Sequence, residues 1–420
     1  MNARYVIALA LLAGSLVTAA VFLYSPASTP PDDNTSIASF IEKHWQHPIA
    51  AQGAAPPDYS TREASLDASA CGVCHSAQYQ DWSNSLHSRS VGAGLQWQLQ
   101  VLPPVQALKC LNCHAPLAEQ KTLLAQKLDW PGVNRQPPPA YVPQDLHRQG
   151  VSCPVCHLRR QQRFGPPPGP GIPPGDTPGL PHGGYSAQQA FTDSRFCSTC
   201  HQFPEDGPAI NGKLLENTYA EWRDSPYPAR GKSCQSCHMP QRKHLWRGIH
   251  DPAMVRQALS VDLDTTLVND HEVAVQAQVR NSGAGHFFPT YLVARVEVSL
   301  WLLDPQGKRQ TQLASAIISR DLDIWLTEEY SDTRLAPNET LTLKAQLDRP
   351  RQPGWQIELR IDVAPREHYE RMFESVLRDQ GDKLSMTVRE ELETALGEAR
   401  NSHYNALKTR RPLPAVAIAN

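Results

Sequence analysis

The sequence lacks an excess of charge of either sign. Its 420 residues include 40 Lys and Arg against 42 Asp and Glu, which gives a formal net charge of -2, and no run of five basic residues occurs. Because affinity for nucleic acid depends mainly on clustered cations, this composition argues against a nucleic-acid-binding protein. A hydrophobic share of 40% also excludes wholesale disorder, and the length predicts two or three domains.

Hydrophobic periodicity is scarce between Cys71 and His250. Within this region, residues 164–181 are mostly Pro and Gly, which excludes a regular helix or a central strand there. A region of this length with so little apolar pattern would bury only a small core of its own. Something other than side chains must therefore fill part of its interior.

The one long apolar run lies at the N-terminus. Residues 5–24 carry no charge, follow Arg4 and are succeeded by the polar Ser25-Pro26-Ala27. The length fits a membrane span, although Ser25-Pro26-Ala27 would also serve as a signal-peptide cleavage site. We expect a signal anchor with Arg4 on the cytoplasmic side and the following chain in the periplasm, or secretion to the periplasm if the segment is cleaved.

Four further segments have recognisable patterns. Residues 25–35 read as a tether, and residues 36–47 as a short helix that ends before Pro48 and docks on the following domain. Between about 258 and 364, apolar and polar residues alternate in several runs separated by turn signals, which predicts six or seven strands of an antiparallel sandwich. After residue 365 an apolar stripe with helical spacing predicts helices.

All ten cysteines occur in five CxxCH motifs, numbered 1 to 5 here in chain order. Two Cys three residues apart can each form a thioether with one vinyl group of a single haem, and the next His is then placed to bind its iron. The predicted thioether residues are Cys71, Cys74, Cys110, Cys113, Cys153, Cys156, Cys197, Cys200, Cys234 and Cys237. The predicted proximal iron ligands are His75, His114, His157, His201 and His238.

Two other interpretations of the motifs fit less well. Structural zinc would need the Cys pairs to combine two by two, and five pairs cannot do so; nor does zinc require a His after every second Cys. A disulfide framework suits an exported protein, but it gives no reason for the regular His. Covalent haem also agrees with the predicted export, so we expect five covalently attached haem c groups.

The motifs are closely spaced along the chain. Successive first cysteines are 39, 43, 44 and 37 residues apart, so each haem has too little chain for a core of its own. The haems should therefore pack against one another as an electron-conducting array and supply the missing apolar interior.

The sixth ligand of each iron is predicted to be His, since the chain has 16 His but only five Met. Ligation by two His implies low-potential haems. His286 is a candidate because it lies in a Gly-rich loop of the β region that could reach a haem. His44 and His47 are weaker candidates, and His271, His368 and His403 are predicted to face solvent. The full set of distal candidates is His87, His147, His182, His244, His250 and His286.

The sequence resembles the multihaem c-type cytochromes grouped with the tetrahaem electron carrier of ammonia oxidisers, pentahaem nitrite reductase and hydroxylamine oxidoreductase. The resemblance rests on residues 71–87 with Tyr79, Trp82 and His87, on 147–153, on 196–202 and on 234–240. It implies that His87, His147 and His182 are distal ligands. The loop 283–290 also looks like one found in β domains attached to such cytochromes.

Two departures weaken the enzymatic analogies. Pentahaem nitrite reductase has Lys in place of His in one motif, and none of the five motifs here does. Hydroxylamine oxidoreductase has eight haems, one of them cross-linked to Tyr, and five motifs do not allow that plan.

The expected fold is mixed, with a loop- and helix-rich pentahaem cytochrome domain followed by an antiparallel β-sandwich and C-terminal helices. The predicted order is 1–24 signal anchor, 25–60 linker with a short helix, 61–254 cytochrome domain, 255–364 β-sandwich and 365–420 helices and tail. We expect electron transfer between a membrane-linked or quinol-linked donor and a periplasmic acceptor, with no catalytic residue. The alternative is an oxidoreductase that acts on a small nitrogen or sulfur compound at one five-coordinate haem.

Overall fold

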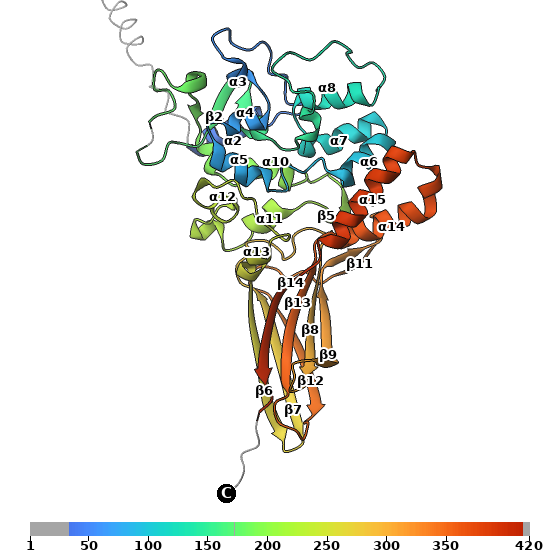
Figure 1. Ribbon diagram of the computed structural model, residues 1–420. Coiled ribbons are helices and arrows are strands. Elements are labelled where there is room, and N and C mark those ends of the chain that lie inside the picture. The colour runs from blue at the N-terminus through green and yellow to red at the C-terminus, as the bar shows by residue number, and fades with distance from the viewer. Residues whose placement is uncertain (1–32, 172, 415–420) are drawn as a thin grey trace, which may run out of the picture.

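The computed structural model describes residues 33–171 and 173–414. A helix-rich part, followed by a long β part, makes up this region, and the last two helices return to the side of the helix-rich part (Figure 1). The sheets of the β part are antiparallel, so the predicted mixed class is confirmed at this level. The predicted export segment 1–24 lies outside the described residues, and no helix among those described is long and apolar enough to cross a membrane.

The first described helix, α2 (Asp33–His44), begins three residues before the predicted start of the helix and ends well before Pro48. Residues 33–35 are therefore helical, which corrects the prediction of a tether for these residues. The apolar face of α2 packs on a small cluster that includes Trp45, Ile49 and Phe196. This contact docks the N-terminal helix on the helix-rich part, as the sequence predicted.

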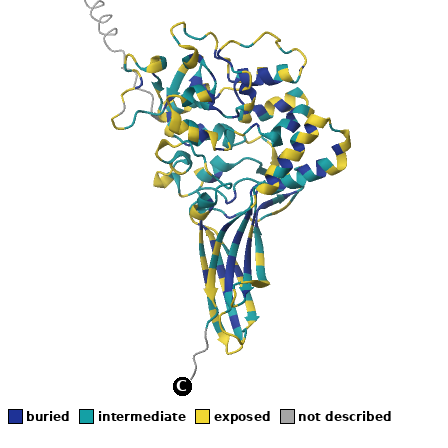
Figure 2. Ribbon diagram, in the orientation of Figure 1, coloured by how far each residue is buried: buried dark blue, intermediate teal, exposed yellow. Residues whose placement is uncertain are grey.

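The helix-rich part is built from short elements joined by long turns. Its buried side chains form small separate clusters instead of one core, and buried and exposed residues are finely mixed in it (Figure 2). Its helices are α3 (Thr61–Ala64), α4 (Ala68–Gly72), α5 (Ser76–Ser83), α6 (Ala93–Val101), α7 (Pro104–His114), α8 (Ala118–Lys127), α9 (Cys153–His157), α10 (Arg195–His201), α11 (Thr218–Arg223), α12 (Cys234–His238) and α13 (Pro252–Ala258).

Short strands and 3₁₀ turns complete this part. The strands are β1 (Leu158–Arg159), β2 (Gln162–Gly165), β3 (Ser186–Ala187), β4 (Ala209–Ile210) and β5 (Lys213–Leu214). The turns are η1 (Leu146–Arg148), η2 (Pro181–Gly183), η3 (Gln189–Thr192), η4 (Pro228–Arg230) and η5 (Pro240–Arg242). Among the described residues between 166 and 180 there is no helix or strand, as the Pro and Gly content predicts.

The β part consists of two antiparallel sheets that share one apolar core. One sheet has the order β12-β7-β6 and the other β14-β13-β8-β9. Period-two alternation turns one face of each strand inward, as at Val273, Val275, Ala277 and Val279 on β7. The strands are β6 (Leu259–Asn269), β7 (Glu272–Asn281), β8 (Arg295–Leu303), β9 (Arg309–Ile318), β12 (Thr340–Asp348), β13 (Gln356–Ala364) and β14 (Tyr404–Pro412).

Two features of this part differ from the expectation. The final strand β14 pairs with β13 through residues that were predicted to be part of a helical tail. A separate hairpin of β10 (Arg320–Leu322) and β11 (Glu329–Asp332) lies toward the helix-rich part.

Helices α14 (Glu367–Gln380) and α15 (Met386–Asn401), joined by η6 (Gly381–Lys383), pack on each other and on α6. Their apolar stripe meets Trp97 through Phe373 and Leu392. His368, at the start of α14, is only 2% exposed. The prediction that His368 faces solvent is therefore wrong, because its helix is held against the chain at Val293 by the His368 amide.

Candidate haem-binding site

Helix geometry brings the three functional residues of each CxxCH motif together. The two Cys and the His stand at positions i, i+3 and i+4, which share one face of a helix. Helices α7, α9, α10 and α12 each end at the motif His. Motif 1 differs, since Cys71 lies in α4 while His75 precedes α5. In each helical motif, both sulfurs and the imidazole can therefore point to one side.

Three motif histidines each face a predicted distal histidine across a short gap. The ring centres of His238 and His286 are 6.3 Å apart, with 13° between their planes. A metal–imidazole bond is about 2 Å long and the bonding nitrogen lies about 1.1 Å from the ring centre, so two imidazoles on one metal have centres roughly 6 Å apart. Two further pairs are spaced similarly: His87 with His201 at 6.3 Å, and His157 with His244 at 6.1 Å.

In several of these histidines, a hydrogen bond to Nδ1 fixes which ring nitrogen carries the proton. Nδ1 of His238 contacts the Arg247 carbonyl oxygen at 2.7 Å, and Nδ1 of His286 contacts the Phe287 carbonyl oxygen at 2.8 Å. A carbonyl only accepts, so Nδ1 carries the proton and Nε2 is left as the ligating nitrogen. Equivalent contacts join His157 to Phe164 at 2.8 Å, His244 to Arg242 at 3.1 Å and His114 to Ser90 at 2.7 Å.

Burial keeps these imidazoles neutral, which is the form that binds a metal. Burial is the main cause that lowers the pKa of His87 to about 3, and it also lowers the pKa of His157 and His201 to about 4. In addition, Nδ1 of His87 is buried without a hydrogen-bond partner among the described residues. A buried, neutral imidazole with an unused nitrogen fits a position beside a bound metal.

His182 lies close to motif 1. Burial, then Arg163, and to a smaller extent His75 lower the pKa of His182. Its backbone is held by Glu63, which accepts from the His182 amide at 2.7 Å, and by Tyr59, which donates to its carbonyl at 2.8 Å. His182 was predicted as a distal ligand without an assigned iron, and this position places it beside motif 1.

The remaining histidines divide by environment. His147 is 7% exposed, and both of its ring nitrogens are buried without a partner among the described residues, which suits a ligand. Burial chiefly lowers the pKa of His250 to about 4. Neither His147 nor His250 has a ring contact with a motif histidine within the described chain.

The ring of His44 contacts the Cys156 carbonyl oxygen through Nε2 at 2.9 Å, so its usual ligating nitrogen is engaged. Three other histidines outside the motifs, His47, His271 and His403, are exposed.

Cysteines of different motifs lie next to one another, and none of the ten forms a disulfide. Motif 4 has the most such neighbours. Cys197 lies next to Cys234 of motif 5, and Cys200 lies next to Cys113 of motif 2. Both also lie near Cys156 of motif 3. Motif 3 in turn adjoins motif 1, because Cys153 lies next to Cys71. The motifs therefore run 1, 3, 4 in space, and motifs 2 and 5 both adjoin motif 4.

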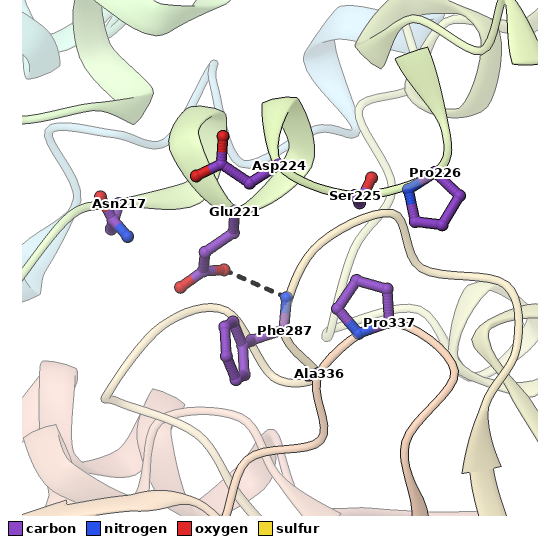
Figure 3. A pocket seen from close by; sticks show the side chains of 8 residues that line it. All are labelled: Asn217, Glu221, Asp224, Ser225, Pro226, Phe287, Ala336 and Pro337. Atoms are coloured by element: carbon purple, nitrogen blue, oxygen red, sulfur yellow. Dashed lines mark hydrogen bonds between the residues drawn. The ribbon is translucent and has the colours of Figure 1, made fainter. Parts of the chain in front are cut away.

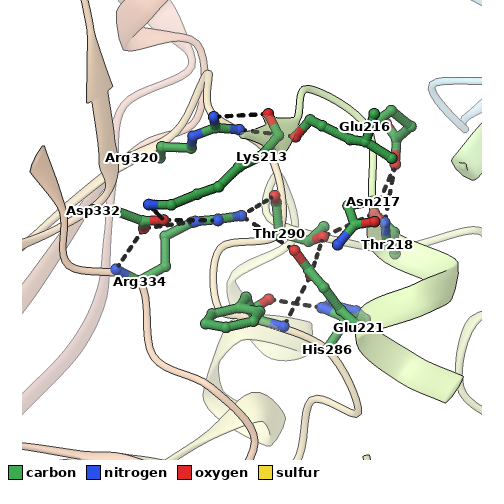
Figure 4. A network of polar contacts seen from close by, with 12 residues as sticks. Lys213, Glu216, Asn217, Thr218, Glu221, His286, Thr290, Arg320, Asp332 and Arg334 are labelled. Atoms are coloured by element: carbon green, nitrogen blue, oxygen red, sulfur yellow. Dashed lines mark hydrogen bonds and ion pairs between the residues drawn. The ribbon is translucent and has the colours of Figure 1, made fainter. Parts of the chain in front are cut away.

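The helix-rich and β parts meet in a polar network (Figure 4). Glu221 on α11 accepts from the Phe287 amide at 3.1 Å and the Thr290 hydroxyl at 2.7 Å, and pairs with Arg334 at 3.3 Å. In the β10–β11 hairpin, Arg320 pairs with Glu329 at 2.7 Å. The bonds of Glu221 hold the loop that carries His286 against α11, the helix that precedes motif 5.

A shallow cavity of about 340 Å³ lies at the same junction (Figure 3). It is lined by Asn217, Glu221, Asp224, Ser225, Pro226, Phe287, Ala336 and Pro337, none of which belongs to a motif. Among the described residues, no group of three or more His, Cys, Asp and Glu is arranged to hold a metal ion by itself. The described chain instead contains three pairs of facing imidazoles, each with one motif His that follows two cysteines, and this arrangement fits haem iron.

The sequence did not indicate two residues of the site. Tyr291 lies five residues after His286 in the same loop, and its hydroxyl is 2.6 Å from Nδ1 of His201. After burial, the nearby charge of Glu216 is the next cause that raises the pKa of Tyr291. Neither residue belongs to a motif or to a periodic pattern, so only their position in the fold identifies them.

No protein-family model matches the sequence, and no curated protein matches it. Among solved structures, a penta-heme cytochrome c552 from Thermochromatium tepidum is similar to this chain. The TM-score is 0.56 at 20% sequence identity, and the alignment covers 84% of this chain and 100% of that chain. The chain therefore shares the fold of that protein.

Proposed function

We propose that this protein is a multihaem c-type cytochrome that binds five haem groups and transfers electrons. The observation that carries the proposal is the spacing of three histidine pairs, His87 with His201, His157 with His244 and His238 with His286, at 6.1 to 6.3 Å between ring centres. Each pair joins a motif His to one of the predicted distal His. Each motif His also follows two free cysteines.

The contacts between motifs support electron transfer as the activity. When bound, haem supplies a one-electron iron couple. The chain's part is to hold the groups close together, and the contacts of Cys153 with Cys71, Cys200 with Cys113 and Cys197 with Cys234 bring every motif beside another. Ligation by two His would keep the potentials low. The similarity in fold to a penta-heme cytochrome c552 agrees with this assignment.

We further propose that the protein works in the periplasm between a membrane-linked or quinol-linked donor and a periplasmic acceptor. This rests on the apolar segment 5–24 with Arg4 before it and on the export that c-type attachment requires. Residues 5–24 would either anchor the protein in the cytoplasmic membrane or be removed as a signal peptide.

Expression in a host with a haem-attachment system tests the assignment. Intact mass spectrometry should give the mass of the chain plus five haem groups, and the reduced protein should have the spectrum of low-spin haem c. Replacing both cysteines of motif 5, with Cys234→Ala and Cys237→Ala, should remove one haem. A chain that takes up no covalent haem in this host would overturn the proposal.

A second candidate function is favoured by the surroundings of motif 2. Among the described residues, no histidine ring lies in ring contact with His114. Instead, the Tyr369 ring and the Glu216 carboxyl lie near the motif cysteines Cys110 and Cys113. An iron bound by His114 alone could take a small nitrogen or sulfur compound as its sixth ligand. Carbon monoxide binding to about one fifth of the reduced haem, with a high-spin EPR signal, would support this function, and its absence would exclude it.

A further inference from the structure

One arginine of the helix-rich part is held by backbone oxygens alone. Arg159 follows motif 3, and its Nε donates to the His44 carbonyl oxygen at 2.6 Å. Its Nη1 donates to the carbonyl oxygens of Val155 at 2.8 Å and Leu158 at 2.6 Å. Nη2 is buried and has no hydrogen-bond partner among the described residues. The three bonds fix the guanidinium in place and leave one of its nitrogens free to bind a ligand.

A second unpaired donor lies beside the guanidinium. Cζ of Arg159 lies over the Trp45 ring, 5.1 Å from its centre. Trp45 is 8% exposed, and its Nε1 is buried without a partner among the described residues. Indole and guanidinium N–H groups can donate but cannot accept. Buried donors are normally paired, so the two together indicate an acceptor that does not belong to the described chain.

The charge of Arg159 indicates that this acceptor is an anion. Arg320, another buried arginine, pairs with the carboxylate of Glu329 at 2.7 Å. Among the described residues, the hydrogen-bond partners of Arg159 are all carbonyl oxygens and none is a carboxylate. Burial chiefly lowers the pKa of Arg159 to about 10, and the nearby Cys156 opposes this. A buried cation without a counter-charge is costly, and a carboxylate matches the planar guanidinium.

The two donors lie between motifs 3 and 4. Trp45 packs in the same apolar cluster as Val155 of motif 3. Its ring also meets that of Phe196, in the motif 4 helix α10, at 5.1 Å between centres. Next to Trp45, the ring of His44 contacts the carbonyl oxygen of Cys156 in motif 3. Haem carries propionate carboxylates, so the proposed function supplies an anion of the required kind at this place.

We propose that Arg159 and Trp45 bind a propionate of a haem held at motif 3 or motif 4. The inference rests on the proposed function, since it requires attached haem. Arg159 Nη2 and Trp45 Nε1 both donate to the carboxylate, and the guanidinium offsets its negative charge. A nearby positive charge favours Fe(II) over Fe(III), because Fe(II) carries one positive charge less. The two residues therefore raise the potential of that haem.

The test combines an EPR-monitored redox titration of the holoprotein with infrared difference spectra of its oxidised and reduced forms. The haem carries a stable isotope in its propionate carboxyl carbons, and wild type, Arg159→Gln and Trp45→Phe are compared. Arg159→Gln should lower the potential of one haem by about a tenfold change in the redox equilibrium, about 59 mV for one electron. It should also shift a carboxylate band that the isotope shifts. Trp45→Phe should shift the same band with a smaller change in potential, since the charge of Arg159 remains.

Arg309→Gln is the matched control. Arg309 also lies over a tryptophan, Trp301, at 5.1 Å, but it is exposed at the start of β9 in the β part. This variant should leave the potentials and the carboxylate bands unchanged.

If Arg159→Gln does not fold, Trp45→Phe decides the matter through the carboxylate band, since it keeps an aromatic ring and removes the indole N–H. Five attached haems with unchanged potentials and bands in both variants would overturn the inference. A wild-type potential that depends on the concentration of added acetate, with no isotope-sensitive band affected in the variants, would assign the site to a free anion and would also overturn it. A chain without attached haem would instead overturn the proposed function.

Discussion

His286 of the β7–β8 loop and His238 of motif 5 lie with their rings nearly parallel, 13° apart in plane and 6.3 Å between centres. A residue of the β part thus completes a pair of facing histidines that begins in the helix-rich part. Both Nδ1 atoms are hydrogen-bonded to backbone carbonyl oxygens, so each ring presents Nε2 to the space between them. The β part is therefore joined to the proposed haem array, and its attachment should be visible in the spectra.

Replacing His286 by Ala should leave one iron without its sixth ligand. We expect a high-spin EPR signal and carbon monoxide binding by about one fifth of the haem beyond that of the wild type, because one of five irons is affected. His271→Ala, in the exposed turn between β6 and β7, is the control and should change neither. Spectra and potentials identical to those of the wild type would show that His286 is not a ligand.

Gly150 lies against the backbone of His87, and its substitution should disturb that ligand. Gly150 has φ +60°, and an added Cβ would lie within contact distance of the His87 carbonyl oxygen and the Ser90 hydroxyl. We expect Gly150→Ala to lower the free energy of unfolding by about 2–4 kcal/mol, the sum of left-handed strain and overpacking. The EPR signal of the haem that His87 and His201 are proposed to bind should change as well.

Gly132→Ala is the control for strain alone. Gly132 has φ +73° and nothing within 4 Å of an added Cβ, so about 1 kcal/mol is expected. Equal losses in the two variants, measured by denaturant unfolding, would contradict the proposed contact with His87.

The buried ion pair at the junction should contribute strongly to stability. Arg320 and Glu329 are 1% and 5% exposed at their side chains, and Arg320 also donates to the carbonyl oxygens of Ile210, Lys213 and Leu214. Arg320→Met leaves these acceptors unpaired, so a loss of about 3–5 kcal/mol is expected in denaturant unfolding. Arg411→Met removes the exposed pair with Asp264 and should cost less than about 1 kcal/mol. Similar losses of unfolding free energy in the two variants would show that the buried ion pair contributes no more to stability than the exposed one.

Buried His368 should make the protein less stable in acid. Burial, with a smaller contribution from Arg371, lowers the pKa of His368 to about 4. The unfolded chain takes up this proton near pH 6.5, before the folded chain does, so stability falls as pH drops from 6.5 to 4. The full effect is about 3 kcal/mol, since one pKa unit corresponds to about 1.4 kcal/mol.

The measurement is the free energy of unfolding at pH 7 and pH 4.5 for the wild type and His368→Gln. The variant should lose part of the pH dependence, whereas exposed His271→Gln should retain all of it. An identical pH dependence in wild type and His368→Gln would show that His368 does not titrate as expected.

The sequence alone determined the features that depend on local spacing. Two Cys and a His at i, i+3 and i+4 share a helix face wherever the segment is helical, so the CxxCH motifs could be assigned to haem without the fold. Period-two alternation similarly identified strands such as β7 and β13. The freedom of the Gly-rich loop also pointed to His286. Strand β14 escaped prediction because it is an edge strand with one buried side chain, Ala406, and basic residues toward its end.

Only the tertiary structure decided which residues meet across the chain. The pairs His87 with His201 and His157 with His244 join segments far apart in sequence, and spacing along a chain carries no information about such contacts. The same holds for the bond between Tyr291 and His201, and for the position of motif 4 beside motifs 2, 3 and 5. His368 likewise became buried because α14 packs against the chain, although its sequence pattern suggested exposure. Local periodicity fixes which face a side chain is on, and packing between distant segments fixes what that face meets.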